Sequence, residues 1–325
     1  MKLLSIPLLL ILISNFDASS LIKLNNRPII GILSQELTTK RLLQYPDKTS
    51  YIAASYIKYV EGAGGRAVPI FIGKNEEYYE NILKNINGVL LPGGAVYFTN
   101  RNGYAEAGAI IYKKIIEMNK NGIYMPIWGT CLGFELLAYM SANNIEIRTA
   151  CTSQAQSIPL NFTRTYNNSK LFGNIPKNIR YTLETKNATA NFHKWCITES
   201  TMEKFKLNKI WKVLSKNIDQ NGLEFISIIE HKKYPFYGVQ FHPEKNIYEF
   251  VRNRNINHDP DVILASQYFA NFFINESRKN FNSFSSELEE QNYLIYNYRP
   301  EYTAKNNSAF EQIYFFDEEI IDNSN

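Results

Sequence analysis

A cysteine between two glycines has the surroundings that most directly favour catalysis. Cys131 lies in residues 129–133 (Gly-Thr-Cys-Leu-Gly), after the apolar residues 125–128 and before a helical pattern. A nucleophile on a tight strand-to-helix turn needs such small neighbours. The positive end of the helix should lower the pKa of the thiol, and the N–H of Leu132 could stabilise an oxyanion. A buried structural cysteine is the alternative interpretation.

A cysteine nucleophile needs a base, and the chain offers only four histidines. His242 ends the apolar run 236–241 and is followed by Pro243, which stops a strand, and by Glu244. In an extended segment the side chains of His242 and Glu244 share a face, so the carboxylate could orient the imidazole. Cys131, His242 and Glu244 are therefore the predicted nucleophile, base and orienting carboxylate.

The elements that must position these residues follow from the hydrophobic pattern. From residue 27, short β-branched runs alternate with helical spacing: the pattern predicts strands over 28–34, 67–72, 88–91 and 124–128, and helices over 51–60, 75–85, 104–119 and 132–140. This alternation predicts an α/β fold with a doubly wound, mainly parallel sheet flanked by helices. Ligands of such sheets lie beyond the carboxyl ends of the strands, which singles out the turns 92–94 and 129–131.

The second half of the chain is less regular. The pattern predicts strands over 180–184, 211–215, 224–230 and 236–241, and a helix over 261–277. Residues beyond 279 are polar and predict an extension along the surface. Because neither a repeat nor a clear linker is visible, we expect residues 21–325 to form a single domain with 280–325 as its C-terminal extension.

The N-terminus has the layout of a secretory signal peptide. A positive start precedes eleven residues, 3–13, that are apolar except for Ser5 and Pro7, and small residues follow at 18–20. We expect cleavage near residue 20 and a mature chain that is secreted or delivered to a lysosome or vacuole; a buried first strand or helix is the alternative. Five N-glycosylation sequons follow, at Asn161, Asn167, Asn187, Asn275 and Asn306. The chain is so rich in asparagine that chance alone accounts for about this many.

Together with residues 239–244 (Val-Gln-Phe-His-Pro-Glu), the cysteine segment resembles the class I glutamine amidotransferase superfamily. Within that superfamily, the chain resembles the γ-glutamyl hydrolases, also called folylpoly-γ-glutamate hydrolases. The resemblance covers nearly the whole mature chain and includes residues 27–33, 51–56, 91–94, 189–195, 274–280 and the region 293–317.

This resemblance implies a role for each matching position. Cys131 matches the nucleophile, His242 the base and acid, and Glu244 the supporting carboxylate. The remaining matches are the backbone oxyanion donors Gly94 and Leu132, the residues Glu135 and Gln240 of a glutamyl pocket, and His193 in a loop over 189–195. His193 is thus a candidate on the substrate side, with a satisfied surface histidine as the alternative.

The implied partner is a poly-γ-glutamyl folate, cleaved through a γ-glutamyl thioester. The family also tends to dimerise. We expect no cofactor and no metal, because the histidines are scattered and none has ligand spacing. A pI of about 8.7 without a long basic run gives little support for a nucleic-acid partner, and no segment after the N-terminus is long enough to predict a membrane span.

Two alternatives belong to other functional classes. A glutaminase that feeds ammonia to a synthetase is disfavoured by the signal peptide, by the lack of a synthetase-like segment, and by Glu135, where related amidotransferases usually carry glutamine. We expect a carboxylate at that position to suit a substrate ammonium or donor better than an amide would. A catalytically inactive binding protein would require the loss of a triad residue, and all three are present.

The composition adds mainly exclusions. With 325 residues, 45% hydrophobic and 20% charged, and a net charge of +4, the chain is an ordinary globular protein and neither disordered nor collagenous. Three cysteines cannot form a disulfide framework. The sequence leaves open whether Cys151 and Cys196 pair, and whether cleavage is endo or exo.

Overall fold

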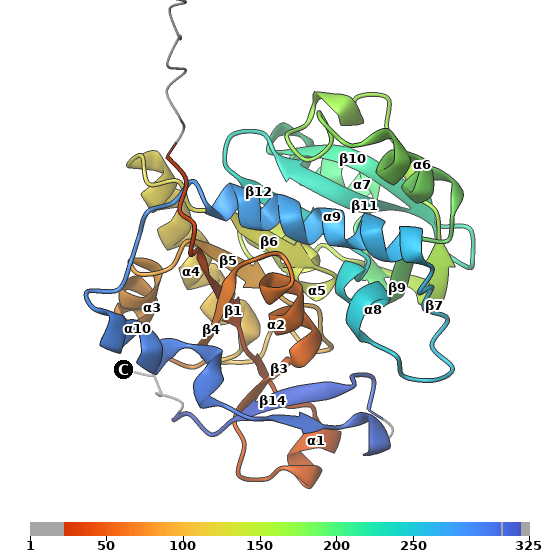
Figure 1. The fold of residues 1–325 in the computed structure, drawn as a ribbon. Helices are drawn as coiled ribbons and strands as arrows, with labels where there is room; N and C mark the ends of the chain where they lie inside the picture. The colour runs from red at the N-terminus through yellow and green to blue at the C-terminus, as the bar shows by residue number, and fades with distance from the viewer. Residues whose placement is uncertain (1–22, 307, 320–325) are drawn as a thin grey trace, which may run out of the picture.

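An eight-stranded sheet forms the centre of the computed structural model, which describes residues 23–306 and 308–319 (Figure 1). The strands lie in the order β4 (Arg66–Ile70), β1 (Ile29–Leu33), β5 (Gly88–Leu91), β6 (Ile127–Thr130), β12 (Phe236–Val239), β11 (Glu224–His231), β10 (Trp211–Ile218) and β8 (Asn161–Phe162). The first five are parallel, and each of the last three pairs antiparallel with the strand before it in this order. The predicted signal peptide lies outside the described residues.

Helices cover both faces of this sheet. One face packs against α3 (Glu76–Leu83), α4 (Tyr104–Lys120), α5 (Leu132–Ser141) and α7 (Glu199–Lys204). The other packs against α2 (Ala54–Glu61), α6 (Lys177–Thr185), α8 (Pro243–Tyr248) and α9 (Pro260–Ser277), of which α9 crosses the front in Figure 1. Because both faces are covered, β1 is buried along its whole length. The predicted α/β class with a mainly parallel sheet is confirmed.

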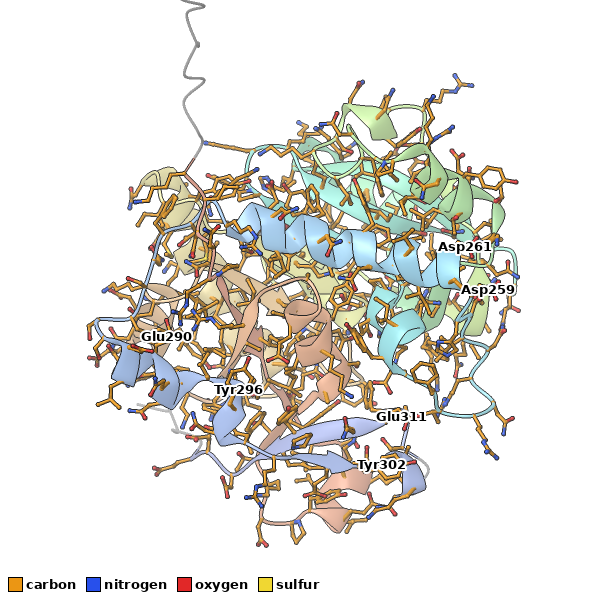
Figure 2. All side chains as sticks on the ribbon, viewed as in Figure 1. Asp259, Asp261, Glu290, Tyr296, Tyr302 and Glu311 are labelled. Carbon is orange, nitrogen blue, oxygen red and sulfur yellow. A yellow bond between two sulfur atoms is a disulfide. The ribbon has the colours of Figure 1, made fainter. Side chains whose placement is uncertain are left out.

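A second, four-stranded sheet joins the two ends of the chain. Its order is β13 (Pro300–Tyr302), β14 (Gln312–Phe316), β3 (Ser50–Ala53) and β2 (Gln35–Glu36), and α1 (Thr39–Gln44) follows β2 in the chain. Helix α10 (Glu287–Tyr293), which precedes this sheet's C-terminal strands, is attached to the N-terminal region. Its Glu290, labelled in Figure 2, pairs with Arg66 and lies 3.3 Å from Arg27. The chain after residue 279 thus pairs with the N-terminal region.

A third, two-stranded sheet carries a disulfide bond. Strands β7 (Thr149–Ile158) and β9 (Thr189–Cys196) are antiparallel, and Cys151 bonds to Cys196. This answers the pairing question that the sequence left open. Short 3₁₀ turns complete the described structure: η1 (Tyr166–Asn168), η2 (Leu207–Lys209), η3 (Ile295–Asn297) and η4 (Ala304–Asn306).

Two sequence predictions of local structure are wrong, and a third is right only in part. The predicted helix over 51–60 corresponds to α2, but its first three residues belong to β3, because β14, more than 250 residues later, pairs with this segment. The predicted strand over 180–184 lies inside α6, where Ile179, Thr182 and Leu183 are buried at helical spacing. The predicted loop over 189–195 is strand β9.

None of the helices in residues 23–306 and 308–319 is both long and apolar enough to cross a membrane.

Candidate active site

Three neighbouring strands of the central sheet end at the predicted catalytic residues. Strands β5, β6 and β12 are adjacent and parallel, so their carboxyl ends meet at one edge. Gly93 and Gly94 follow β5, Cys131 follows β6, and His242 follows β12 after two residues. The topology therefore brings together residues that are up to about 150 positions apart in the sequence.

Cys131 occupies a strained turn between β6 and α5. Its φ of 52° and ψ of −107° lie in a region that L-residues rarely adopt. The glycines on either side make the turn feasible: a Cβ on Gly129 would lie 2.6 Å from the carbonyl oxygen of Gly133, and one on Gly133 would lie 2.0 Å from that of Leu91. The N–H of Cys131 donates to Val239 at 2.8 Å, which fixes the elbow to β12.

The expected lowering of the thiol pKa is not found. Cys131 is 3% exposed, and burial together with the carboxylates of Glu135 and Glu244 raises its pKa well above the ordinary value. The N–H of Leu132 donates toward the sulfur and offsets this only in part. The prediction from the helix dipole was wrong because desolvation of a buried thiolate outweighs one helix end.

His242 and Glu244 form a buried pair. The imidazole Nδ1 lies 2.7 Å from Glu244 Oε1, and neither residue is more than 4% exposed. Burial lowers the pKa of His242, whereas the imidazole outweighs burial and keeps the pKa of Glu244 low. A neutral imidazole that donates from Nδ1 to an ionised Glu244 leaves Nε2 as the acceptor, which is the form a general base needs.

Tyr56 is a member of this cluster that the sequence analysis did not single out. Its hydroxyl accepts from the N–H of Gly93 at 2.8 Å and lies 3.3 Å from His242 Nδ1. Burial, followed by the charges of Glu244 and Cys131, raises its pKa well above the ordinary value, so the phenol stays protonated. Tyr56 lies in the segment 51–56, which is part of the family resemblance, but the segment alone does not indicate what the tyrosine does.

The turn after β5 approaches the catalytic pair closely. A Cβ on Gly93 would lie 2.6 Å from His242 Cε1 and 3.1 Å from Cys131 Cβ, so the imidazole and the cysteine flank this glycine. A Cβ on Gly94 would lie 1.8 Å from Gln35 Oε1. The Gln35 amide donates to the carbonyl oxygens of Pro92 and Gly93 at 3.1 and 3.2 Å and fixes the turn. The N–H of Gly94 donates to no acceptor among the described residues, which leaves it open for an oxyanion.

Glu135 and Gln240 lie behind the nucleophile and contact each other. Gln240 Nε2 is 3.0 Å from Glu135 Oε1 and 4.0 Å from Cys131 Sγ. Arg148 Nη1 lies 3.1 Å from the second carboxylate oxygen, and its guanidinium stacks over Phe98 at 4.0 Å. Burial raises the pKa of Glu135 to about 7, although Arg148 and Gln240 both favour the ionised form.

Both carboxylate oxygens of Glu135 already have protein partners, and its role toward a substrate ammonium or donor stays a prediction. Arg148 is one of these partners. It could not have been found from the sequence, since its contact with Glu135 depends on how the start of β7 lies against α5.

His193 lies inside β9 rather than in a loop. It is 4% exposed, with Nε2 at 3.2 Å from Asn191 Oδ1 and Nδ1 at 3.1 Å from the carbonyl oxygen of Trp195. Burial, and then the neighbouring His242, lower its pKa to about 3. Both sulfurs of the disulfide lie 3.5 Å from Nδ1. These contacts place His193 against the disulfide. Its role on the substrate side stays a prediction.

A hollow of about 380 Å³ opens beside the catalytic pair. Gly94 and His242 line it, and Phe192 and Phe310 give it apolar walls. Its volume lies within the range of small-molecule sites. Thus a protonatable base, an open backbone N–H and a buried nucleophile meet next to a cavity, which is the arrangement of a cysteine-dependent acyl-transfer site on a mainly parallel α/β fold.

Comparisons with known proteins narrow this class. The family model described as peptidase C26 matches residues 28–244. The chain is 43% identical over 297 residues to a gamma-glutamyl hydrolase of Rattus norvegicus, with 90% of each chain covered. It is 42% identical over 316 residues to gamma-glutamyl hydrolase B of Dictyostelium discoideum, covering 97% of this chain and 90% of that one. A solved structure named SMU.1228c matches 77% of this chain and 99% of its own at 14% identity, with a TM-score of 0.45.

The chain belongs to the peptidase C26 family. The comparisons confirm the resemblance that the sequence indicated and the prediction that the protein is a hydrolase. They leave the roles of the individual site residues as predictions.

Proposed function

We propose that this chain hydrolyses the γ-glutamyl amide bonds of folylpoly-γ-glutamates and related poly-γ-glutamates through a thioester on Cys131. The observation that carries the proposal is the meeting of three strand ends, which places Cys131, the His242–Glu244 pair and the open N–H of Gly94 beside one hollow. The curated relatives named gamma-glutamyl hydrolase support the substrate class.

The resting pair is neutral, because burial raises the pKa of Cys131 and lowers that of His242. Nε2 of His242 therefore takes the thiol proton as the sulfur attacks the γ-carbonyl carbon. The resulting oxyanion would accept from the N–H groups of Leu132 and Gly94. Each such donor contributes about 3–4 kcal/mol of transition-state stabilisation in comparable sites.

Collapse of the tetrahedral intermediate breaks the C–N bond. His242 returns its proton to the departing nitrogen, and a γ-glutamyl thioester remains on Cys131. A water molecule then gives a proton to His242 and attacks the thioester, which releases the γ-carboxylate and restores the thiol. Glu244 keeps Nδ1 as the donor and stabilises the imidazolium in both steps.

The test is mass spectrometry of products from a pteroyl poly-γ-glutamate, with the wild type beside Cys131→Ala. We expect cleavage by the wild type, an acyl adduct on the peptide that contains Cys131 after acid quench, and no turnover by the variant. A substrate with α-linked glutamates should stay intact. Cleavage of the α-linked isomer, or an adduct on another residue, would contradict the mechanism; preferential hydrolysis of free glutamine would favour a glutaminase.

The proposal extends to delivery through the secretory pathway, with residues 1–20 as the signal peptide. Two features support it. All five sequon asparagines are exposed: Asn161, Asn167, Asn187, Asn275 and Asn306. The Cys151–Cys196 disulfide belongs in an oxidising compartment. N-terminal sequencing after expression in a secretory host should give a start near residue 21, and a start at Met1 would contradict the proposal.

A further inference from the structure

Four cationic side chains line two adjoining hollows, and the first of these hollows lies beside His242. The inner hollow, beside His242, is lined by Arg41, Lys245 and Arg254. A second hollow of about 260 Å³ is lined by Lys40 and shares Arg41 and Arg254 with the first. Among the residues that the structure describes, no aspartate or glutamate lines either hollow. We call Lys40, Arg41, Lys245 and Arg254 together the cationic groove.

Two of these cations lie against aromatic rings, and none of the four forms a close ion pair within the described residues. None of the four makes an ion pair within 4 Å to a carboxylate of the described residues. Lys245, 4% exposed, has its Nζ 4.4 Å from the ring centre of Phe310. The Arg41 guanidinium lies 4.4 Å from the ring centre of Tyr51. Aromatic faces thus position Arg41 and Lys245. Arg41 also donates to the Tyr51 hydroxyl, and a guanidinium has five N–H donors, so further donors remain for a ligand.

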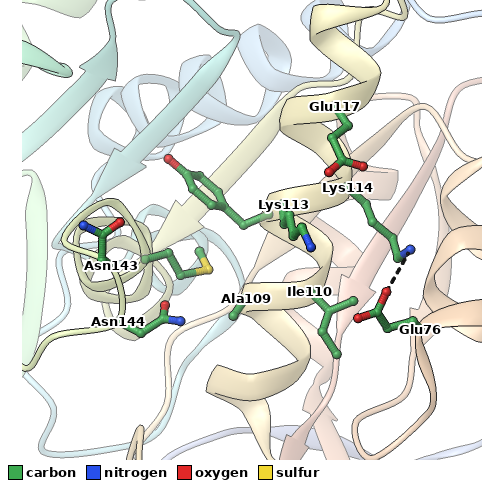
Figure 3. A pocket seen from close by; sticks show the side chains of 10 residues that line it. Glu76, Ala109, Ile110, Lys113, Lys114, Glu117, Asn143 and Asn144 are labelled. Carbon is green, nitrogen blue, oxygen red and sulfur yellow. Dashed lines mark ion pairs between the residues drawn. The ribbon is translucent and has the colours of Figure 1, made fainter.

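A third hollow shows that an excess of positive charge is not a general property of the hollows in this molecule. It has about 440 Å³, lies along α4, and is drawn in Figure 3. Lys113 and Lys114 line it together with Glu76 and Glu117, and Lys114 pairs with Glu76 at 3.5 Å. Its charges balance, whereas the cationic groove carries four positive charges and no negative one, although the chain has 35 basic and 31 acidic residues.

The position of the groove assigns it to one side of the scissile bond. His242 and the oxyanion donor Gly94 line the inner hollow, while Cys131, Glu135 and Gln240 do not. In the proposed reaction His242 protonates the departing nitrogen, so the groove begins where the leaving segment begins. A poly-γ-glutamate carries one free α-carboxylate on every residue, and a row of unpaired cations complements such a chain.

We propose that the cationic groove binds the α-carboxylates of the departing γ-glutamyl segment, and that the enzyme therefore prefers bonds followed by two or more glutamyl residues. The inference rests on the proposed function. The inner hollow, with Lys245, receives the first departing residue, and only a longer segment reaches the outer hollow and Lys40. The first products from a long substrate are then γ-glutamyl peptides rather than single glutamates.

The test compares kcat/KM for pteroyl-γ-diglutamate and pteroyl-γ-pentaglutamate and identifies the first products by mass spectrometry. For the wild type, the pentaglutamate should be cleaved with the higher kcat/KM. Arg254→Gln, Lys40→Gln and their double variant should each lower the ratio of the two kcat/KM values, by about tenfold for Arg254→Gln, which is the scale of one hydrogen-bonded charge. Rising ionic strength should lower the ratio as well.

Lys113→Gln, in the charge-balanced hollow, is the matched control and should keep the wild-type ratio. A wild type that cleaves both substrates, but whose ratio is unchanged by the groove variants, would overturn the groove and leave the proposed function standing. A wild type that cleaves neither would overturn the proposed function instead. Release of single glutamates as the first product from the pentaglutamate would also overturn the groove. Because Lys40 is exposed and Arg254 half-buried, thermal unfolding should verify that each variant folds.

Discussion

The catalytic corner, which consists of Gly94, Cys131, His242 and Glu244, adjoins the cationic groove, but the two regions are built in opposite ways. The corner consists of mostly buried residues that glycines allow to approach within a few ångströms, and each follows the end of a strand. The groove consists of longer side chains from α1, α8 and the segment before α9, with an aromatic wall from the C-terminal region. The corner is rigid and desolvated, and the groove is open and charged.

This difference predicts that the corner determines the rate of bond cleavage and that the groove determines the preference for chain length. Changes in the corner should reduce cleavage of every substrate, because they act on the reacting atoms. Changes in the groove should alter the dependence on chain length, because they act on carboxylates remote from the scissile bond. The predictions below use this contrast, starting with the largest effect.

His242→Ala should lower kcat by roughly 10⁴-fold on short and long substrates alike, since nucleophile and base act as one unit. Glu244→Ala should be milder, by about 10²-fold relative to His242→Ala, because orientation is lost while the base remains. Single-turnover kinetics on both substrates measures this. Equal severity of the two variants would mean that Glu244 does more than orient the imidazole.

Gly94→Ala should lower kcat by about 10²–10³-fold with a smaller change in KM, the loss expected for one misplaced oxyanion donor. The added Cβ would lie 1.8 Å from Gln35 Oε1 and would displace the turn. Steady-state kinetics on a short substrate gives both parameters.

Gln35→Ala provides the matched test of this explanation. It removes the atoms that the new Cβ would meet, so the double variant Gly94→Ala/Gln35→Ala should recover part of the activity lost in Gly94→Ala. If the double variant is simply worse, the steric explanation for Gly94 is wrong and only the flexibility of the glycine matters.

The corner was largely predictable from the sequence, and the groove was not. Cys131, His242 and Glu244 stand in short local patterns, and the rule for parallel sheets places strand ends at one edge. The groove depends on β14 pairing with β3, a contact between residues more than 250 positions apart that no local pattern encodes. Arg41 and Arg254 look like ordinary surface cations until that pairing is known.

Energetics were less predictable than geometry even within the corner. A helix end can be inferred from the sequence, but the degree of burial that raises the pKa of Cys131 cannot. The same limit applies to Glu135, whose partners Arg148 and Gln240 come from segments that the fold alone brings together.

Glu135→Gln should change the pH dependence of stability. Burial raises the pKa of Glu135 from 4.5 to about 7 in the folded state, so between these values the folded state binds one more proton than the unfolded state. The free energy of unfolding of the wild type should therefore fall with rising pH by about 1.4 kcal/mol per unit relative to the variant, and by about 3 kcal/mol at most. Urea unfolding from pH 4.5 to 7.5 measures this.

Glu146→Gln is the control, because Glu146 pairs with the same Arg148 at the surface. Burial opposes it, but hydrogen bonds from Arg148 keep the pKa of Glu146 low. Its contribution has the opposite sign and is lost as the pH falls. Equal pH slopes for the wild type and Glu135→Gln would show that Glu135 is ionised throughout this range and that the ion pair with Arg148 outweighs burial.

The smallest predicted effect tests where the groove ends. Asn306, a predicted glycosylation site, lines the outer hollow next to Arg254, whereas Asn275 is exposed on α9 and lines neither hollow. In protein from a glycosylating host, a glycan on Asn306 would crowd the outer hollow. Asn306→Gln should then raise the ratio of kcat/KM for pentaglutamate over diglutamate by less than the change expected for Arg254→Gln, and Asn275→Gln should leave it unchanged. Intact mass measures occupancy first. An occupied Asn306 whose removal leaves the ratio unchanged would mean that the departing segment does not reach the outer hollow, and the groove would then end at Lys245 and the inner hollow.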